Sequence, residues 1–434
     1  MNYRQTLEYI DGLGAYGTNI VPGLENIRNL CGWLGDPQKE LPVVHIAGTN
    51  GKGSVLAYIS TMLQCGGYRT GRFLSPPILE YREIIQINQR PISQKKLCEY
   101  TERVKEACES LVASGRPHPT RFEFETAMAF LYFQEQACDL AVIETGMGGR
   151  LDATNIIEHP VVSVIASVSM DHMKFLGGTL SEIAGEKAGI CKPGCPLVMM
   201  EQEPEAEQAL LQRAQELGCP VTEVSLRDVE NIRHGLENQK FDCFGMRDLE
   251  IGLAGNYQIV NAALALAAVR KLGERGFPVE ERRMREGLAE TRWPGRFDVI
   301  GRNPLFIADG AHNEDAAKKL AGTVRFYFTN RRIVYIMGVL KDKEYEKIIA
   351  ETYAYADQII TITPPGNPRA MPAYELAQAV RAYHPRVTAA DSLEEAVEMA
   401  YMLAGQEDVI VSFGSLSYLG RLMHIVEKRK RPEV

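Results

Sequence analysis

The sequence predicts an α/β protein of two domains, and three observations carry that prediction. The chain has 434 residues, too many for one ordinary hydrophobic core. Short β-branched runs alternate with longer helical patterns, which is typical of parallel sheets covered by helices. Pro294-Gly295 then divides this alternation into two series, as a linker between domains does. We therefore expect domains at residues 1–294 and 297–434.

The first series contains four runs that are nearly all apolar, as expected for parallel strands buried on both faces. They are Val43–Ile46, Arg72–Leu74, Leu140–Ile143 and Val161–Ser167. Helical patterns follow at Ser54–Gln64, Thr126–Gln136 and Leu180–Gly189. Residues 201–250 are more polar and less regular, and their pattern places no strand. The first domain is therefore predicted to hold a parallel sheet.

The second series repeats the alternation after Pro294-Gly295. Its predicted strands are Leu305–Ala308, Ile333–Met337, Gln358–Thr361 and Val409–Phe413, with helices between them. A second, smaller α/β domain is the expected result.

Composition restricts the class of protein. Hydrophobic residues make up 45% and charged residues 24%, the profile of a soluble globular protein. A net charge of -8 gives no reason to expect nucleic acid or an anionic membrane as a partner. No apolar run approaches the roughly 20 residues that cross a bilayer, and the start resembles no secretory signal. The nine cysteines are scattered without a C-x-x-C pair, which favours reduced thiols and a cytoplasmic location.

A glycine-rich loop follows the first predicted strand and precedes a helical pattern. Backbone N–H groups and the helix dipole in such a loop converge on a polyphosphate, and glycines let the phosphate approach the backbone. Lys52 would add a mobile positive charge, and Ser54 an oxygen ligand for Mg²⁺. Ile46 and Gly53 depart from the common G-x-x-x-x-G-K-[ST] pattern, so a β-α turn without a nucleotide remains the alternative. The predicted ATP-binding residues of the loop are Thr49, Asn50, Gly51, Lys52, Gly53 and Ser54.

The loop Gly48-Thr49-Asn50-Gly51-Lys52-Gly53-Ser54 resembles that of folylpolyglutamate synthases and dihydrofolate synthases, within the Mur ligase superfamily. Further segments resemble the same family in the same order. They are Leu74-Ser75-Pro76-Pro77, the run from Glu144 to Asn155, Asp171-His172, Glu186-Lys187-Ala188-Gly189-Ile190, Trp293-Pro294-Gly295-Arg296-Phe297 and Asp309-Gly310-Ala311-His312-Asn313. The sequence departs from the pattern of these relatives at two positions. Pro77 stands where the family often has His, and Tyr257 stands where the superfamily often has His in its adenine motif. The resemblance implies an N-terminal P-loop ATPase domain and a C-terminal Rossmann-like domain with the active site between them.

The resemblance also implies a reaction. A carboxylate is a poor electrophile, so ATP would first convert it to an acyl phosphate, which an amine can attack. The expected substrates are ATP, L-glutamate and a folate, and we further expect the chain to use dihydropteroate as well. We expect a monomer that binds small molecules only.

Metal ligands follow from the same resemblance, which implies two Mg²⁺ sites. The family uses the positions of Ser75, Glu144 and His172 for one of them. Each stands just past or at the end of a predicted strand, where ligands bind in parallel sheets. Oxygen ligands suit Mg²⁺, whereas a histidine ligand is unusual for it. From the residues alone, Glu144 would as readily be a helix cap or surface charge, and His172 a packing histidine.

Lys187 lies in a helical pattern, and the residues alone suggest a surface lysine paired with Glu182 or Glu186. The resemblance instead implies that its amine is carbamylated and binds the second Mg²⁺. That reaction needs a neutral amine, and therefore a buried or electropositive setting.

The remaining ATP contacts are also implied by the family. Asn261 would meet the adenine, Arg296 the phosphates and Asp309 the ribose. His312 would lie near the γ-phosphate, so that domain closure completes the site. The expected catalytic residues are Lys52, His172, Lys187 and His312.

For the pterin, Asp152 matches a family position that contacts folate or pteroate, and Phe122 could supply a stacking surface. Buried aromatic residues at a helix start more often belong to the core.

Two other readings of the sequence stay open. A peptidoglycan-type Mur ligase would share the mechanism, but only about 45 residues precede the loop, too few for a nucleotide-sugar domain. A P-loop ATPase that is not a ligase would need neither the metal-ligand cluster nor the Asp309–Asn313 segment.

Overall fold

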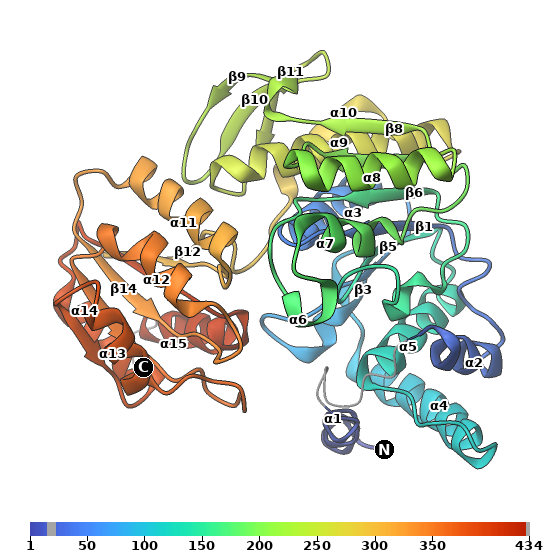
Figure 1. Ribbon diagram of the computed structural model, residues 1–434, viewed down its shortest axis with the longest axis horizontal. Coiled ribbons are helices and arrows are strands. Elements are labelled where there is room, and N and C mark those ends of the chain that lie inside the picture. Colours follow the sequence, from blue (N-terminus) through green and yellow to red (C-terminus); the bar gives the residue numbers. More distant parts are fainter. Residues whose placement is uncertain (15–22, 431–434) are drawn as a thin grey trace.

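The computed structural model describes residues 1–14 and 23–430, and the chain folds into two α/β bodies that lie side by side (Figure 1). Each body is built around its own sheet. The two separate sheets support a division of the chain into two domains. The exact domain bounds, residues 1–294 and 297–434, remain a prediction.

The first sheet has eight strands in the order β4-β3-β2-β5-β1-β6-β7-β8. Its centre is parallel and buried on both faces, as the apolar runs predict. The parallel strands are β1 (Val43–Ala47), β2 (Thr70–Phe73), β5 (Leu140–Glu144), β6 (Val162–Ile165), β7 (Leu197–Met200) and β8 (Val221–Val224). The loop after β1 therefore opens between β5 and β6 at the carboxyl edge of the sheet.

Helices cover both faces of this sheet. On one face lie α3 (Lys52–Cys65), α9 (Asn256–Glu274) and α10 (Glu281–Glu290). The other face carries α1 (Tyr3–Gly12), α2 (Glu25–Trp33), α4 (Gln94–Ala113), α5 (Arg121–Glu135), α7 (Leu180–Ala188) and α8 (Pro204–Glu216), while α6 (Met173–Leu176) is one short turn. Among the described residues, no helix is both long and apolar enough to cross a membrane.

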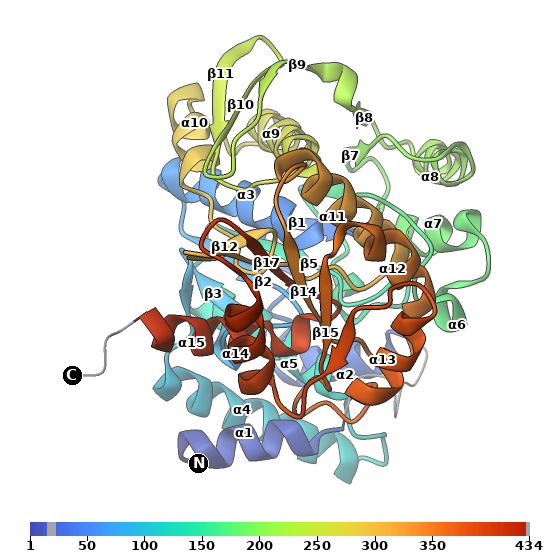
Figure 2. The same cartoon turned by 90° about the vertical axis from the view of Figure 1, so that its left-hand side faces the viewer.

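The C-terminal sheet has the order β12-β13-β17-β14-β15-β16 and is parallel except for β12. Its strands are β12 (Asp298–Arg302), β13 (Leu305–Ala308), β14 (Ile333–Met337), β15 (Gln358–Thr361), β16 (Val387–Ala389) and β17 (Val409–Phe413). One face packs against α11 (Glu314–Tyr327), α12 (Tyr345–Thr352) and α13 (Ala373–Arg381), the other against α14 (Leu393–Leu403) and α15 (Leu419–Lys430). Figure 2 views the molecule from the side of this body.

The sequence patterns predict the fold class correctly and miss several details. The four strands predicted in the C-terminal body have the predicted bounds, but β12 and β16 were not predicted, and β6 ends at Ile165, two residues before the predicted end at Ser167. Helix α5 begins at Arg121 rather than Thr126, because Thr120 and Glu123 form a capping box. Helix α9 begins at Asn256, so Asn261 lies in its second turn.

The first sheet is not wholly parallel, which corrects the prediction. Strands β3 (Ile85–Ile87) and β4 (Arg90–Pro91) form an antiparallel hairpin at one edge. Its two-residue turn, Asn88-Gln89, has positive φ at both positions, the geometry of a type I′ turn. The segment in which no strand was predicted contains α8, the parallel strand β8 and a small antiparallel sheet that packs against α9. The strands of that sheet are β9 (Val229–Arg233), β10 (Gln239–Cys243) and β11 (Met246–Ile251).

Candidate active site

A cavity of about 380 Å³ lies between the two bodies, at the carboxyl ends of strands from both sheets. The first body contributes the loops that follow β1, β2, β5 and β6, and the second contributes the loops that follow β13 and β17. Such sheet edges are where α/β proteins bind ligands. Predicted site residues that line this cavity are Thr49, Asn50, Gly51, Lys52, Gly53, Ser54, Ser75, Glu144, His172, Lys187, Asn261, Arg296, Asp309 and His312.

The glycine-rich loop is fixed by its own backbone and by the loop after β6. Gly51 has φ +90° at the start of α3, and a Cβ there would lie 2.7 Å from Asn261 Oδ1, so only glycine fits. Thr49 Oγ1 donates to the carbonyl of Ser169 at 3.0 Å and accepts from its N–H at 3.1 Å. These contacts hold the N-terminus of α3 open toward the cavity, as phosphate binding requires.

Lys52 and Glu144 both line the cavity and lie next to each other. Lys52 Nζ lies 3.7 Å from Glu144 Oε1 and donates to the carbonyl of Thr49 at 3.3 Å. Burial raises the pKa of Glu144, although Lys52 and Arg296 oppose the shift. A buried carboxylate facing cations is suited to bind a further cation or to be neutralised by one.

A chain of amides links the loop to α9. Gln258 Nε2 donates to Ser54 Oγ at 3.2 Å, and Asn261 Nδ2 donates to Gln258 Oε1 at 3.1 Å. Ser54 Oγ therefore keeps its own hydrogen free for another acceptor. Asn261 Oδ1 faces Gly51, so the amide predicted to meet adenine borders the phosphate loop directly.

Lys187 is buried in α7, only 2% exposed, and not a surface residue. The glutamates that helical spacing offers are engaged elsewhere: Glu186 pairs with Arg150 at 2.7 Å, and Glu182 caps the start of α7. Within the described chain Lys187 Nζ has no ion pair or hydrogen-bond acceptor. Burial first, and the charge of Lys52 second, lower the pKa of Lys187 to about 7. A large fraction of this amine is therefore neutral near physiological pH.

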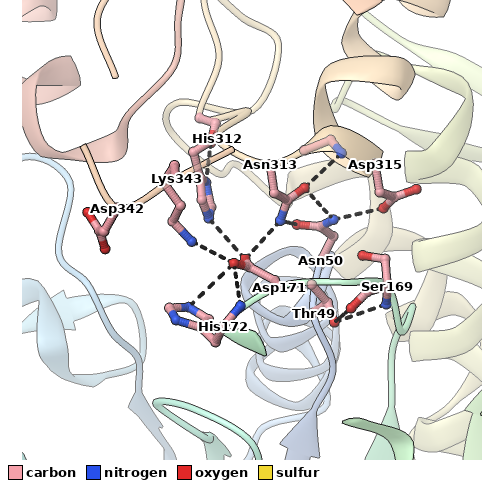
Figure 3. A network of polar contacts seen from close by, with 12 residues as sticks. Thr49, Asn50, Ser169, Asp171, His172, His312, Asn313, Asp315, Asp342 and Lys343 are labelled. Carbon is pink, nitrogen blue, oxygen red and sulfur yellow. Dashed lines mark hydrogen bonds and ion pairs between the residues drawn. The ribbon is translucent and has the colours of Figure 1, made fainter. Parts of the chain in front are cut away.

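Asp171, which follows β6, is the centre of a polar network that joins the two bodies (Figure 3). Its Oδ1 accepts from Lys343 Nζ at 2.7 Å and from the N–H of His172 at 2.8 Å. Its Oδ2 accepts from Asn313 Nδ2 at 3.0 Å. Burial raises the pKa of Asp171, but Lys343 and, to a smaller extent, His172 and His312 together outweigh burial and hold this pKa below its usual range.

The two cavity histidines flank this carboxylate. The Nε2 atoms of His172 and His312 each lie 3.9 Å from an Asp171 oxygen, too far for a hydrogen bond. Burial and the charge of Lys343 lower the pKa of each histidine to about 4. Both imidazoles are therefore neutral at pH 7, and each can offer a lone pair as a ligand or proton acceptor.

A second interdomain contact lies beside this network. Asn50 and Asn313 exchange amide hydrogen bonds at 3.2 Å in both directions, and Asn50 Nδ2 also donates to Asp315 at 2.7 Å. Asp315 in turn accepts from Lys319 Nζ at 2.7 Å. Helix α11 of the second body is thus tied to the glycine-rich loop of the first.

Asp309 closes the cavity from the C-terminal side. Its oxygens accept from the N–H groups of Phe297 and Ala311, both at 2.8 Å, and the hydroxyl of Tyr257 contacts it. Burial raises the pKa of Asp309, although Arg296 opposes this. The carboxylate thereby fixes the chain just past the linker beside Arg296.

Asp152 and Phe122 do not line the cavity. Asp152 accepts from the N–H groups of Met147 and Thr154 and from the Thr154 hydroxyl at 2.6 Å, so it fixes the loop after β5. Phe122 packs against Phe73, with ring centroids 5.8 Å apart, and lies directly beneath Gly146. Their predicted contacts with the pterin stay predictions, and Gly146 and Met147 are the neighbours that reach the cavity.

Sequence reasoning missed four polar residues around the cavity: Asp171, Asn313, Lys343 and Lys319. The first two stand in segments that resemble the family and directly follow a strand or precede a helix, so their position was a usable signal. Lys343 and Lys319 lie in a loop and a helix of the second body, where no local pattern separates them from other surface lysines.

The fold and this site define a class of protein, an ATP-dependent ligase of the Mur family. The Mur ligase middle domain matches residues 46–269, and the Mur ligase, glutamate ligase domain matches residues 295–416. The chain belongs to this family, and its named relatives are folylpolyglutamate and dihydrofolate synthases.

Three relatives show the extent of the similarity. The dihydrofolate synthase/folylpolyglutamate synthase of Bacillus subtilis is 35% identical over 430 residues, which cover 96% of this chain and 97% of that protein. The structure of Mycobacterium tuberculosis folylpolyglutamate synthase complexed with ADP superposes with a TM-score of 0.90 at 31% identity, covering 98% of both chains. An FPGS-AMPPCP-folate complex gives 0.86 at 30% identity, over 98% of this chain and 100% of that one. The predicted family and enzyme class are confirmed.

Proposed function

We propose that this chain joins L-glutamate to folates, using ATP to activate the folate carboxylate as an acyl phosphate. One observation carries the proposal: the carboxyl edges of both sheets converge on a cavity that holds Lys52, Glu144 and Arg296 together. The relatives support the substrates, since one is solved with AMPPCP and folate and others carry the names of these ligases.

Two steps follow from the chemistry. The folate carboxylate attacks the γ-phosphorus of ATP, the bond to ADP breaks, and an acyl phosphate forms. The amine of glutamate then attacks the acyl carbon, loses a proton, and phosphate leaves. Lys52 and Arg296 would offset negative charge on the transferring phosphoryl group, which is the main demand of such a step. His312, predicted near the γ-phosphate, would face the same group.

The residues around Glu144 fit a magnesium ion. Glu144, Ser75 and Ser54 offer oxygen ligands inside the cavity, Ser54 through the lone pair that Gln258 does not use, and His172 offers a neutral imidazole. Bound Mg²⁺ would neutralise phosphate charge. We propose two such ions, with Lys187 as a carbamate completing the second site.

Lys187 suits carbamylation because its amine is buried, unpaired among the described residues and shifted toward the neutral form. The neutral amine adds CO₂ and releases one proton, so a cation becomes an anion. The nearby ammonium of Lys52 would stabilise that anion.

We further propose that dihydropteroate is a second acyl substrate. Both substrates carry a carboxylate at the far end of a pterin-containing molecule, so one site can serve both if it holds the pterin in two registers. The bifunctional name of the Bacillus subtilis relative supports this. Asp152→Ala would then cost dihydropteroate ligation more than polyglutamylation, directly or through the Met147 loop. Ligation of glutamate to tetrahydrofolate but never to dihydropteroate would refute the second activity.

We propose a monomer located in the cytoplasm. The nine free cysteines support the location, because reduced thiols are typical of the cytoplasm.

Release of ADP tests the main function. Purified protein with ATP and Mg²⁺ is expected to release ADP only when both glutamate and tetrahydrofolate are present, and mass spectrometry should show a product heavier by one glutamyl residue. A peptidoglycan precursor in place of tetrahydrofolate serves as the control for the other Mur reactions. Release that ignores both substrates would indicate a P-loop ATPase instead of a ligase.

A further inference from the structure

We infer that His45 is a positioning residue for the acyl substrate, because it fixes the loop after β5 at the cavity through Thr154 and Asp152. The inference rests on the proposed function, since it concerns how that reaction holds its folate. His45 lies in β1, between Ile143 of β5 and Ser163 of β6, and is wholly buried. The two chemical steps of the proposed reaction do not use this side chain.

A continuous hydrogen-bond chain runs from His45 to the cavity. His45 Nε2 lies 2.8 Å from Thr154 Oγ1, and the Thr154 hydroxyl donates to Asp152 Oδ1 at 2.6 Å. Asp152 Oδ2 accepts from the N–H of Met147 at 2.9 Å, and the N–H of Gly146 also donates to this carboxylate. Gly146 and Met147 both line the cavity, so the hydrogen-bond chain ends on backbone that a substrate can touch.

The donors and acceptors of this hydrogen-bond chain fix the tautomer of His45. Thr154 has one hydroxyl hydrogen and uses it on Asp152, so its oxygen can only accept from His45. Nε2 therefore carries the hydrogen, and Nδ1 has a lone pair without a donor among the residues that the structure describes. Burial lowers the pKa of His45 to about 3, which keeps the ring neutral at pH 7.

Packing alone does not explain a histidine at this position. Every residue of β1 is buried, and those other than His45 are apolar. An apolar side chain would avoid the unsatisfied Nδ1, which is unfavourable in a buried site. The contact that an apolar residue would lose is the hydrogen bond from Nε2 to Thr154.

Asp152 would act on a substrate through the loop after β5. Its carboxylate can accept about four hydrogen bonds. The Thr154 hydroxyl and the backbone N–H groups of Gly146, Met147 and Thr154 supply four donors. These contacts use the acceptor sites of the carboxylate, so its effect on the cavity depends on where it holds Met147.

The loop after β5 is placed to meet the acyl substrate and not ATP. Strand β5 lies on one side of β1 and β6 on the other, and the loop after β6 is the one that contacts the glycine-rich loop. On the β5 side, the cavity is lined by the apolar side chains of Pro76 and Met147. An apolar wall suits the rings of a folate, whereas phosphates need cations and backbone N–H groups.

Four variants test the hydrogen-bond chain in pairs. His45→Leu and Thr154→Val break it, whereas His45→Gln keeps a donor and Thr154→Ser keeps the hydroxyl. His45→Leu is expected to raise the KM for tetrahydrofolate by about 3- to 10-fold, the effect of one neutral hydrogen bond. Thr154→Val should raise it further, because it also removes a hydrogen bond to a carboxylate.

The other kinetic constants show whether the effect is selective. In all four variants the KM values for ATP and glutamate should stay within about two-fold of wild type, and the two conservative variants should keep the wild-type KM for tetrahydrofolate. Ser163→Ala is the matched control, since it removes a buried hydroxyl of the same sheet that donates to the carbonyl of Ile190. It should leave all three KM values unchanged.

Thermal unfolding separates this role from a purely structural one. His45→Leu removes an unsatisfied nitrogen, so its midpoint of unfolding should not fall below that of wild type. A histidine that only supports the sheet would instead give a lower midpoint with an unchanged KM for tetrahydrofolate, or equal rises in all three KM values. Either result, or a His45→Gln protein as impaired as His45→Leu, would overturn the inference.

Nitrogen NMR tests the hydrogen-bond chain without using the reaction. In ¹⁵N-labelled protein, His45 should show the tautomer with hydrogen on Nε2, in a signal that is absent from His45→Gln and shifted in Thr154→Val. Hydrogen on Nδ1 would overturn the inference whatever the substrate. A wild-type protein that has the expected tautomer but forms no glutamylated product would instead refute the proposed function, and with it the substrate assigned to this loop.

Discussion

The two sheet edges that face the cavity differ in how they hold their functional groups. At the edge of the first sheet, the glycine-rich loop is set by backbone geometry, with Gly51 in a left-handed conformation and Thr49 fixed to Ser169. At the edge of the second sheet, the groups are charged or amide side chains, such as Lys343 and Asn313, that reach across to the first body. One edge is preformed, and the other depends on how the two bodies meet.

This difference predicts that changes at the first edge remove chemistry, whereas changes at the second weaken substrate binding. Lys52→Ala is expected to have the largest effect, a loss of at least about 100-fold in kcat, because its charge acts on the transferring phosphoryl group. Thermal unfolding should be nearly unchanged. Lys95→Ala, an exposed lysine of α4, is the control. Near-normal turnover in Lys52→Ala would remove the phosphate-loop assignment.

Lys187→Ala tests the buried amine of the first body. We expect a loss of about 10- to 100-fold, as for a removed metal-supporting group, and partial recovery with added short carboxylates that fill the vacated anionic position. With ¹³C-labelled CO₂, the wild-type protein should give a carbamate NMR signal that strengthens as pH rises through about 7, where the amine loses its proton. Lys192→Ala, half-buried outside the cavity, should keep both activity and signal. A signal that survives in Lys187→Ala would contradict the assignment.

Arg296→Ala tests the role of the linker that joins the two bodies. Its guanidinium lines the cavity near Glu144 and Asp309, so we expect the KM for ATP to rise by about 10-fold, the loss of one charged contact. Arg292→Ala is the matched control, since that arginine is exposed and, among the residues that the structure describes, donates only to carbonyls of its own segment. An unchanged rate at limiting ATP would show that Arg296 is structural.

Asp315→Ala should have the smallest effect, because it belongs to the second edge and acts through Asn50. We expect the KM for ATP to rise about three-fold, in the range of one surface-accessible polar contact, with kcat unchanged. Glu314→Ala removes the same charge from the same turn of α11 but pairs with Lys347 inside the second body. A larger rise in the KM for ATP in Glu314→Ala than in Asp315→Ala would contradict the difference between the two sheet edges.

The parts of the fold that the sequence predicts are those with a strong local cause. Buried parallel strands such as Ile333–Met337 and Val409–Phe413 are continuous apolar runs, and their bounds match. Strands β9 to β11 were missed because one face of that small sheet is exposed and its residues alternate with charges. Helix α5 began earlier than expected because a capping box, and not apolar periodicity, sets its start.

The site divides in the same way. The placement of Thr49 to Ser54 at the cavity could be predicted from the loop alone, whereas that of Ser75, Glu144 and His172 was implied by the family resemblance. The burial of Lys187 could not be predicted from helical spacing, which offered Glu182 and Glu186 as partners. The tertiary structure shows that both glutamates bind other groups. Lys343 was equally hidden, because its partner Asp171 lies 172 positions earlier in the chain.

Trp293 gives the molecule an intrinsic optical reporter. A Cβ placed on Gly53 of the glycine-rich loop would lie 2.7 Å from Trp293 Cζ2, so the indole that begins the linker rests directly on the nucleotide loop. The chain has two tryptophans, and the other, Trp33, is 59% exposed and lies in α2, away from the linker. In a Trp33→Phe protein, tryptophan fluorescence would therefore arise from the linker alone, and occupancy of the loop could be followed by its emission wavelength without any attached label.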